Sequence, residues 1–140
     1  MRSKDPIIEW SDAKFSVNVA EIDAQHKKLI AMINDIHETM KNKSAHGENL
    51  KKILHGLEDY INRHFTTEEN YFTVFKYPDA AAHIREHQAF SKKVAEFKGS
   101  LNYDLLFAPD IYYFLKDWLI HHICVTDRAY GPWFNQNGLK

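Results

Sequence analysis

The sequence predicts an all-α protein, an up-down-up-down antiparallel four-helix bundle with an N-terminal arm. Apolar residues recur at steps of three and four in four segments, and the alternation typical of a strand persists nowhere. Short connections join the segments, so neighbouring helices are expected to run antiparallel. With 140 residues, 5 glycines and 4 prolines, the chain suits a single domain over residues 1–140 without long linkers.

The N-terminal arm is predicted over residues 1–18 and comes before the first helix. It contains Trp10 and Phe15, two large apolar side chains that we expect to lie across the bundle. The first helix is predicted over about residues 19–41, and a polar segment that reaches Gly47 ends it. The apolar seam of this helix consists of Ile22, Leu29, Ile33, Ile36 and Met40.

Three further helices are predicted over about residues 48–76, 79–98 and 109–130. Pro78 and Pro109 suit the first turns of the last two, because a missing N–H costs nothing there. The seams of the three helices include Leu50, Leu54, Leu57, Ile61, Tyr71 and Phe75, then Phe90, Val94 and Phe97, then Ile111, Leu115, Trp118, Leu119 and Ile123. We expect the closing Trp133-Phe134 pair to pack back onto the bundle.

The balance of charge and the single cysteine exclude several classes of protein. Lys plus Arg number 18 and Asp plus Glu 19, a net charge of −1 that argues against nucleic-acid binding. Cys124 alone excludes an intrachain disulfide framework and a cysteine-rich zinc site. The first ten residues lack a signal-peptide pattern, and no apolar run approaches the roughly 18 residues that cross a membrane. We therefore expect a cytoplasmic protein; its oligomeric state stays open, and a monomer is compatible with the pattern.

Nine histidines are the unusual feature of the composition, and several interrupt the apolar seams. A lone histidine on an apolar face is usually a core residue bonded to a carbonyl. Here every predicted helix directs at least one imidazole inward, and each unpartnered buried polar group costs roughly 1–3 kcal/mol. A shared metal ion would satisfy them together. The inward positions are His26, His64, Glu68, His83, His87 and one of His121 and His122.

The spacing of these residues supports a metal site. His64 and Glu68 are i, i+4 neighbours on one helix face, as are His83 and His87. Asp127 follows His122 by five residues, about 140° around an ideal helix, and would need a widened last turn to join the site. The fourth helix is apolar nearly all round, so periodicity alone does not separate His121 from His122.

Four ordered motifs resemble the hemerythrin family, in particular its single-domain bacterial members. They are Ile22-Asp-Ala-Gln-His26, His64-Phe-Thr-Thr-Glu-Glu69, Tyr77-Pro78 followed by His83 and His87, and Trp118-Leu-Ile-His-His122 followed by Asp127. The resemblance implies that His83, His87 and His122 hold one non-heme iron and that His26 and His64 hold the other. It further implies that Glu68 and Asp127 bridge the two ions together with an oxo or hydroxo group.

The resemblance also implies a function, reversible dioxygen binding for storage, delivery or sensing, and no enzymatic activity. The seven ligands and the bridging oxygen leave one position of two six-coordinate ions free, on the iron with two histidines. Neutral imidazoles outnumber carboxylates five to two, which favours the ferrous state over the high-valent iron of carboxylate-rich oxygenases. The expected oxygen pocket is apolar, which would slow autoxidation, although the same side chains are also bundle core. Its predicted residues are Leu29, Phe65, Leu119 and Ile123.

Some residues depart from the family pattern or fall outside it. Phe72 stands where the family commonly has a methionine, and we expect it to affect pocket shape and ligand access and not the metal. His37, His46, His55 and His121 match no ligand position. The same residues are also compatible with two other functions. One is a di-iron enzyme that reduces peroxide or nitric oxide or oxidises ferrous iron, and the other is a metal-buffering or structural site for zinc or manganese.

Overall fold

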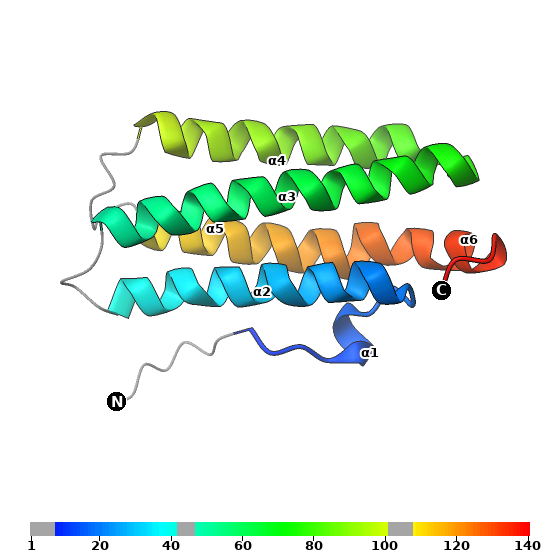
Figure 1. The fold of residues 1–140 in the computed structure, drawn as a ribbon, viewed down its shortest axis with the longest axis horizontal. Helices are drawn as coiled ribbons and strands as arrows, with labels where there is room; N and C mark the ends of the chain where they lie inside the picture. The colour runs from blue at the N-terminus through cyan, green and yellow to red at the C-terminus, as the bar shows by residue number, and fades with distance from the viewer. Residues whose placement is uncertain (1–7, 42–46, 101–107) are drawn as a thin grey trace.

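A computed structural model describes residues 8–41, 47–100 and 108–140, which contain four long helices packed side by side (Figure 1). The helices are α2 (Ala20–Lys41), α3 (Gly47–Phe75), α4 (Ala80–Ser100) and α5 (Ala108–His121). Successive helices run in opposite directions, and α2 packs against both α3 and α5. No strand occurs among the described residues, so the all-α bundle prediction is confirmed.

Beyond α5 the chain stays helical but changes helix type three times. A π-helix, η2 (His122–Asp127), is followed by a 3₁₀ turn, η3 (Arg128–Tyr130), and by α6 (Gly131–Gln136). The fourth helix predicted over 109–130 therefore corresponds to three segments of different winding. The polar connection at 42–46 and the segment 101–107 lie outside the described residues.

Residues 8–18 form an arm that runs beside α2 (Figure 1). Asn34 fixes its beginning, because its amide accepts from the Ile8 N–H at 3.0 Å and donates to the Ile8 carbonyl at 2.9 Å. A short helix, α1 (Asp12–Phe15), buries Phe15 completely, and the ring of Trp10 stacks on it at 5.6 Å. The arm thus covers the bundle with the two aromatic residues expected to do so.

The end of the arm meets α6 at a close backbone contact. A Cβ on Gly131 would lie 2.6 Å from the carbonyl oxygen of Val17, so this approach requires glycine. On the other side of α6, the Trp133 indole donates to the Phe75 carbonyl at 2.8 Å, and Phe134 is fully buried. The arm, the end of α3 and the C-terminal turn therefore close one end of the bundle.

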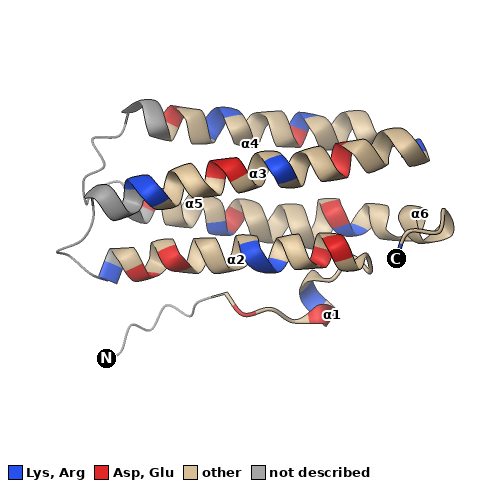
Figure 2. Cartoon of the chain, in the orientation of Figure 1, with Lys and Arg blue, Asp and Glu red and all other residues tan. Residues whose placement is uncertain are grey.

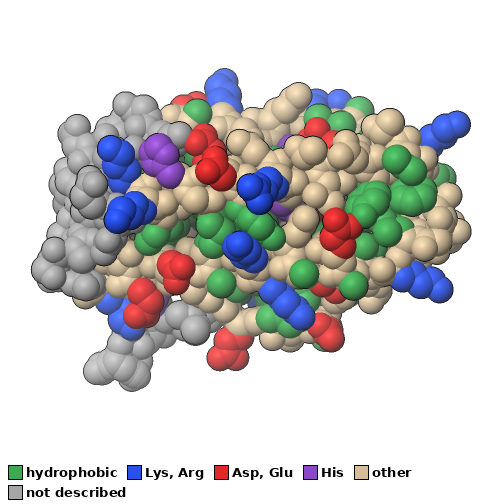
Figure 3. All heavy atoms as spheres, viewed as in Figure 1, with side chains coloured by type: hydrophobic (Ala, Val, Ile, Leu, Met, Phe, Trp, Pro, Cys, Tyr) green, Lys and Arg blue, Asp and Glu red, His purple; other side chains and the backbone are tan. Residues whose placement is uncertain are grey.

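Charged side chains are spread over the helices and the surface. Lys, Arg, Asp and Glu occur along all four long helices, and on the face drawn in Figure 3 the two signs are interspersed (Figures 2 and 3). Within the described part of the chain, no helix combines the length and apolar character that crossing a membrane requires.

Candidate metal centre

Seven polar side chains from three long helices and the π-helix meet inside the bundle, and none is more than 2% exposed. They are His26 on α2, His64 and Glu68 on α3, His83 and His87 on α4, and His122 and Asp127 on η2. These are the seven residues that the resemblance described above implied as ligands, and they include His122 and not His121. Burial of this many polar groups is costly unless they share a partner.

The helix geometry explains how each element supplies its pair. On α3 and α4 the two residues are separated by four positions and therefore lie on one face. On η2 the separation is five, and the i→i+5 winding of a π-helix brings His122 and Asp127 to the same side. The Nε2 atom of His122 lies 2.9 Å from Oδ1 of Asp127.

Glu68 directs its two oxygens toward different imidazoles. Its Oε1 lies 2.9 Å from Nε2 of His87 and 3.5 Å from Nε2 of His83. Its Oε2 lies 3.5 Å from Nε2 of His64 and accepts a short hydrogen bond from the Tyr130 hydroxyl. Glu68 therefore stands between two groups of histidines.

The two oxygens of Asp127 also face different imidazoles. Its Oδ1 lies 2.8 Å from Nε2 of His83 and 2.9 Å from that of His122, whereas Oδ2 lies 2.9 Å from Nε2 of His26. The side chains consequently form two overlapping groups whose ligand atoms lie within 4.8 Å of one another. One group is Glu68, His83, His87 and His122, and the other is His26, His64, Glu68 and Asp127.

The donor atoms fit cations. Buried atoms without a hydrogen-bond partner among the described residues include Nε2 of His83, His87 and His122, Oε1 of Glu68 and both oxygens of Asp127. Imidazole nitrogens and carboxylate oxygens that converge in this way are ligands that a divalent transition metal binds. The arrangement can therefore hold metal ions.

Burial and the mutual contacts of these groups shift their pKa values strongly. Burial lowers the pKa of His64 to about 4, although Glu68 acts in the opposite direction. Burial also acts to lower the pKa of His83, but its contacts with Asp127 and Glu68 raise that pKa to about 10. Burial would raise the pKa of both carboxyl groups, yet the surrounding imidazoles hold both well below the usual range. Without metal, the cluster therefore holds carboxylates beside a protonated His83 at neutral pH.

Three polar side chains contact the outer nitrogens of His64, His87 and His122, and none of the three was predicted from the sequence to have a role. The Nδ1 atom of His64 lies 2.6 Å from Oε1 of Gln25. Glu69 lies 2.8 Å from Nδ1 of His87, and Glu86 lies 2.8 Å from Nδ1 of His122. We call these three residues (Gln25, Glu69 and Glu86) the outer partners. Each immediately precedes or follows a candidate ligand in sequence, which is the signal that could have identified them.

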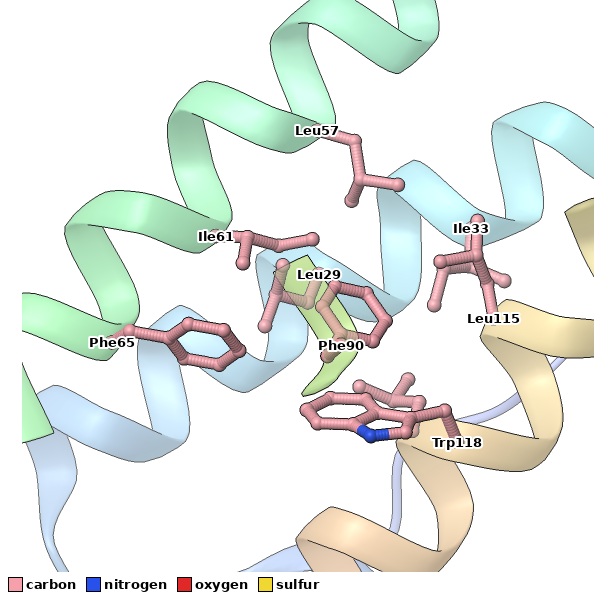
Figure 4. Close-up of a pocket in the computed structure, with 9 residues that line it drawn as sticks. Leu29, Ile33, Leu57, Ile61, Phe65, Phe90, Leu115 and Trp118 are labelled. Atoms are coloured by element: carbon pink, nitrogen blue, oxygen red, sulfur yellow. The ribbon is translucent and has the colours of Figure 1, made fainter. Parts of the chain in front are cut away.

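A small apolar cavity has a volume of about 10 Å³, room for roughly one water-sized molecule, and Figure 4 shows the side chains that line it. Two of these side chains also contact imidazoles of the cluster. Leu29, Phe65 and Leu119 of the predicted oxygen pocket line it, whereas Ile123 is buried in the same core without lining it. Phe65 stacks on His87 at 3.7 Å and Trp118 stacks on His122 at 4.2 Å. Further lining residues are Ile33, Leu57, Ile61, Phe90 and Leu115.

The remaining residues considered from sequence lie away from the cavity. Phe72 packs on His83 with ring centres 4.8 Å apart and belongs to the separate apolar cluster near Tyr130, so it does not shape the cavity. His37 is buried outside the cluster, and His55 and His121 are exposed. His46 lies outside the described residues.

Comparison with known proteins agrees with this geometry. The family profile described as Hemerythrin HHE cation binding domain matches residues 17–134, which include all seven clustered side chains. The chain belongs to the hemerythrin family. Hemerythrin relatives match over most of their length: a bacteriohemerythrin of Methylococcus capsulatus is 33% identical over 127 residues, covering 90% of this chain and 95% of that protein. A bacteriohemerythrin of Clostridium acetobutylicum is 30% identical, covering 86% and 96%.

Solved hemerythrin structures share the fold. A crystal structure of wild-type hemerythrin superposes with a TM-score of 0.78 at 31% identity, covering 91% of this chain and 97% of that one. A variant of hemerythrin with leucine 114 of that protein changed to alanine gives a TM-score of 0.79 at 30% identity.

Proposed function

We propose that this chain binds dioxygen reversibly at a centre of two non-heme iron ions and does not convert it to another product. The main support for the proposal is the orientation of the two carboxylates. Glu68 and Asp127 each direct one oxygen toward one group of imidazoles and the second oxygen toward the other group. A carboxylate in this position suits a bridge between two cations. Imidazole and carboxylate together are ligand types that iron accepts.

The two groups of side chains define which residues would hold which ion. His83, His87 and His122 would bind one iron, and His26 and His64 the other. Glu68 and Asp127 would bind both, with an oxo or hydroxo group as the remaining bridge. When loaded and reduced, the pair of ions supplies the two electrons that dioxygen binding requires.

The protein's own contribution is to orient the imidazoles and to keep the surroundings apolar. Phe65 and Trp118 each place one ring face on an imidazole and line the neighbouring cavity. None of the side chains that line this cavity is titratable, so the cavity offers no general acid or base to a bound ligand. Exclusion of water and protons favours release of intact dioxygen over its reduction.

The relatives named bacteriohemerythrin support this reading over an enzymatic one. Storage, delivery and sensing of dioxygen all require the same reversible binding step. We assign that step to this chain and expect it to operate without a nucleic-acid or membrane partner.

A cycle of reduction and aeration, followed by visible spectroscopy with an iron assay, tests the proposal. Anaerobically reduced protein with two irons per chain is expected to be nearly colourless, to colour in air and to bleach again under vacuum. Colour that forms irreversibly would indicate an oxidase or a peroxide- or nitric-oxide-reducing enzyme instead. A protein that holds zinc or manganese and stays colourless would indicate metal buffering or a structural site.

A further inference from the structure

Each of the outer partners connects its own helical element to a later one along the chain. Gln25 on α2 reaches His64 on α3, Glu69 on α3 reaches His87 on α4, and Glu86 on α4 reaches His122 on η2. Two of the outer partners are themselves held by threonines. Gln25 Nε2 donates to Thr67 Oγ1 at 3.2 Å, and the Thr126 hydroxyl donates to Glu86 at 3.1 Å.

These contacts fix the tautomer of each imidazole. An Nδ1–H that donates to a carboxylate or amide oxygen leaves the lone pair on Nε2, the atom that faces the cluster. A carboxylate acceptor also draws the Nδ1 proton toward itself, which makes Nε2 a stronger electron donor to a metal. A neutral amide acceptor orients the ring in the same way but adds no negative charge.

The charged and neutral partners are not distributed evenly. Both carboxylates, Glu69 and Glu86, act on histidines of the group that contains His83. The other group has the amide of Gln25 on His64, and Nδ1 of His26 has no hydrogen-bond partner among the described residues. The two metal positions therefore differ in the charge behind their ligands as well as in the number of their histidines.

We propose that Glu69 and Glu86 act as positioning residues that make the three-histidine iron the easier of the two to oxidise. Gln25, whose amide is neutral, would leave the two-histidine iron with a higher reduction potential. The inference rests on the proposed di-iron centre. It assigns the electronic difference between the ions to three side chains that bind no metal themselves.

The expected size of the effect is moderate because both carboxylates reach solvent. The side chain of Glu69 is 36% exposed and that of Glu86 is 39% exposed, so water screens part of their charge. We expect removal of one charge to weaken the preference for ferric over ferrous iron about tenfold, which is about 59 mV for a one-electron step.

Glu86→Gln and Glu69→Gln test the role of charge, because each keeps a hydrogen-bond acceptor while it removes the carboxylate. In an anaerobic spectroelectrochemical titration, each ion loses one electron to the electrode mediator as ferrous iron becomes ferric. The two steps are expected at different potentials in the wild-type protein. Either variant should raise the reduction potential of the lower step and leave that of the upper step nearly unchanged. If the hydrogen bonds only position the rings, these variants leave both potentials unchanged, and the inference is overturned.

Gln25→Glu is the reciprocal test, since it adds a carboxylate behind His64 on the other side. This variant should lower the reduction potential of the upper step. Both kinds of variant should therefore reduce the difference between the two potentials, one by raising the lower potential and the other by lowering the upper one. A shift of the lower step instead would contradict the assignment. Glu38→Gln, on an exposed part of α2 three turns from His26, controls for a change in surface charge and should move neither step.

Iron counting separates failure of this inference from failure of the proposed function. A wild-type protein that lacks two irons per chain contradicts the di-iron centre itself. Two irons in every variant, with unchanged potentials in Glu86→Gln and Glu69→Gln, contradict only the role of the outer partners.

Discussion

His122 and Asp127, five residues apart, contact each other at 2.9 Å because the turn between them is a π-helix. In an α-helix the same separation would turn Asp127 about 140° away from His122. The wider turn brings both residues to the buried side, and it places Oδ1 of Asp127 2.8 Å from His83. One local change of winding thus supplies the last carboxylate of the cluster.

Asp127→Ala should remove ligands from both metal positions at once, since the two oxygens of Asp127 face different groups of imidazoles. We expect metal affinity to fall by more than the roughly 10–100-fold that loss of an outer hydrogen-bond partner causes. Iron content per folded chain measures this. His121→Ala, at the exposed histidine beside His122, should retain the wild-type iron content. Two irons in Asp127→Ala would contradict the bridging assignment.

Metal loading should release protons. Contacts with Asp127 and Glu68 raise the pKa of His83 to about 10, so His83 is protonated in the metal-free protein at pH 7 and must lose that proton to bind a metal. We expect about one proton per chain from this residue. Calorimetric titration with a divalent metal in buffers of different ionisation enthalpy measures it. An absence of proton release at pH 7 would show that His83 is already neutral.

The same pKa shift gives the metal-free fold a pH dependence with a definite sign. The folded pKa of His83 lies above its unfolded value of about 6.5, so its contribution to the free energy of unfolding is complete below about pH 6.5. It is lost as the pH rises through 10. His83→Gln should flatten the unfolding free energy between those limits in urea titrations of the metal-free protein. An unchanged slope would refute the ion pair.

Tyr130→Phe should destabilise the protein, because the buried hydroxyl of Tyr130 donates to Glu68. A hydrogen bond to a charged group contributes about 1.5–3 kcal/mol to the free energy of unfolding. Urea unfolding of the metal-free variant gives the value. Tyr71→Phe is the matched control, because it removes a hydroxyl that donates to the Glu21 carboxylate at the exposed surface, and it should lower the free energy of unfolding less. Equal losses in the two variants would show that burial of the Tyr130–Glu68 hydrogen bond adds nothing to its contribution.

Leu119→Asn should speed autoxidation of the oxygenated protein, since it puts a polar group into the cavity wall. The rate at which the oxygenated colour is lost after removal of the reductant gives the measurement. Leu119→Met keeps the wall apolar with similar volume and should stay close to the wild-type rate. An unchanged rate in Leu119→Asn would mean that this wall does not protect the centre.

Gly131→Ala should destabilise the fold by about 1–3 kcal/mol, because its Cβ would meet the Val17 carbonyl oxygen at 2.6 Å and backbone must move. Gly56→Ala on α3 is the matched control. There the nearest atom is the flexible Met32 side chain at 3.5 Å, and alanine is the better helix former by about 0.5–1 kcal/mol. Chemical denaturation should therefore shift the two variants in opposite directions.

The bundle could be predicted because its apolar seams repeat at helical spacing over each long helix. The pairs His64–Glu68 and His83–His87 were equally accessible, since four residues is one helical turn. Asp127 was harder, because its place depends on a π-turn that periodicity does not reveal. The resemblance, and not the spacing, favoured His122, which the structure buries, over His121, which it exposes.

The outer partners could not be predicted from the sequence for a different reason. Glu69 and Glu86 lie on half-exposed flanks of their helices, where a charged residue is ordinary. Their role depends on the distance between neighbouring helices, and the residue pattern within each single helix does not predict that distance. The residues that line the cavity could be predicted in part, because Leu29 and Leu119 lie one helical turn from His26 and His122.

The place of η2 in the element order has a consequence for assembly of the cluster. Among the elements that supply clustered side chains, η2 is the last along the chain. A polypeptide without residues 122–127 therefore lacks His122 and also Asp127, whose two oxygens face both groups of imidazoles. In the proposed centre, neither metal position is complete until Asp127 has been synthesised and has packed into the bundle.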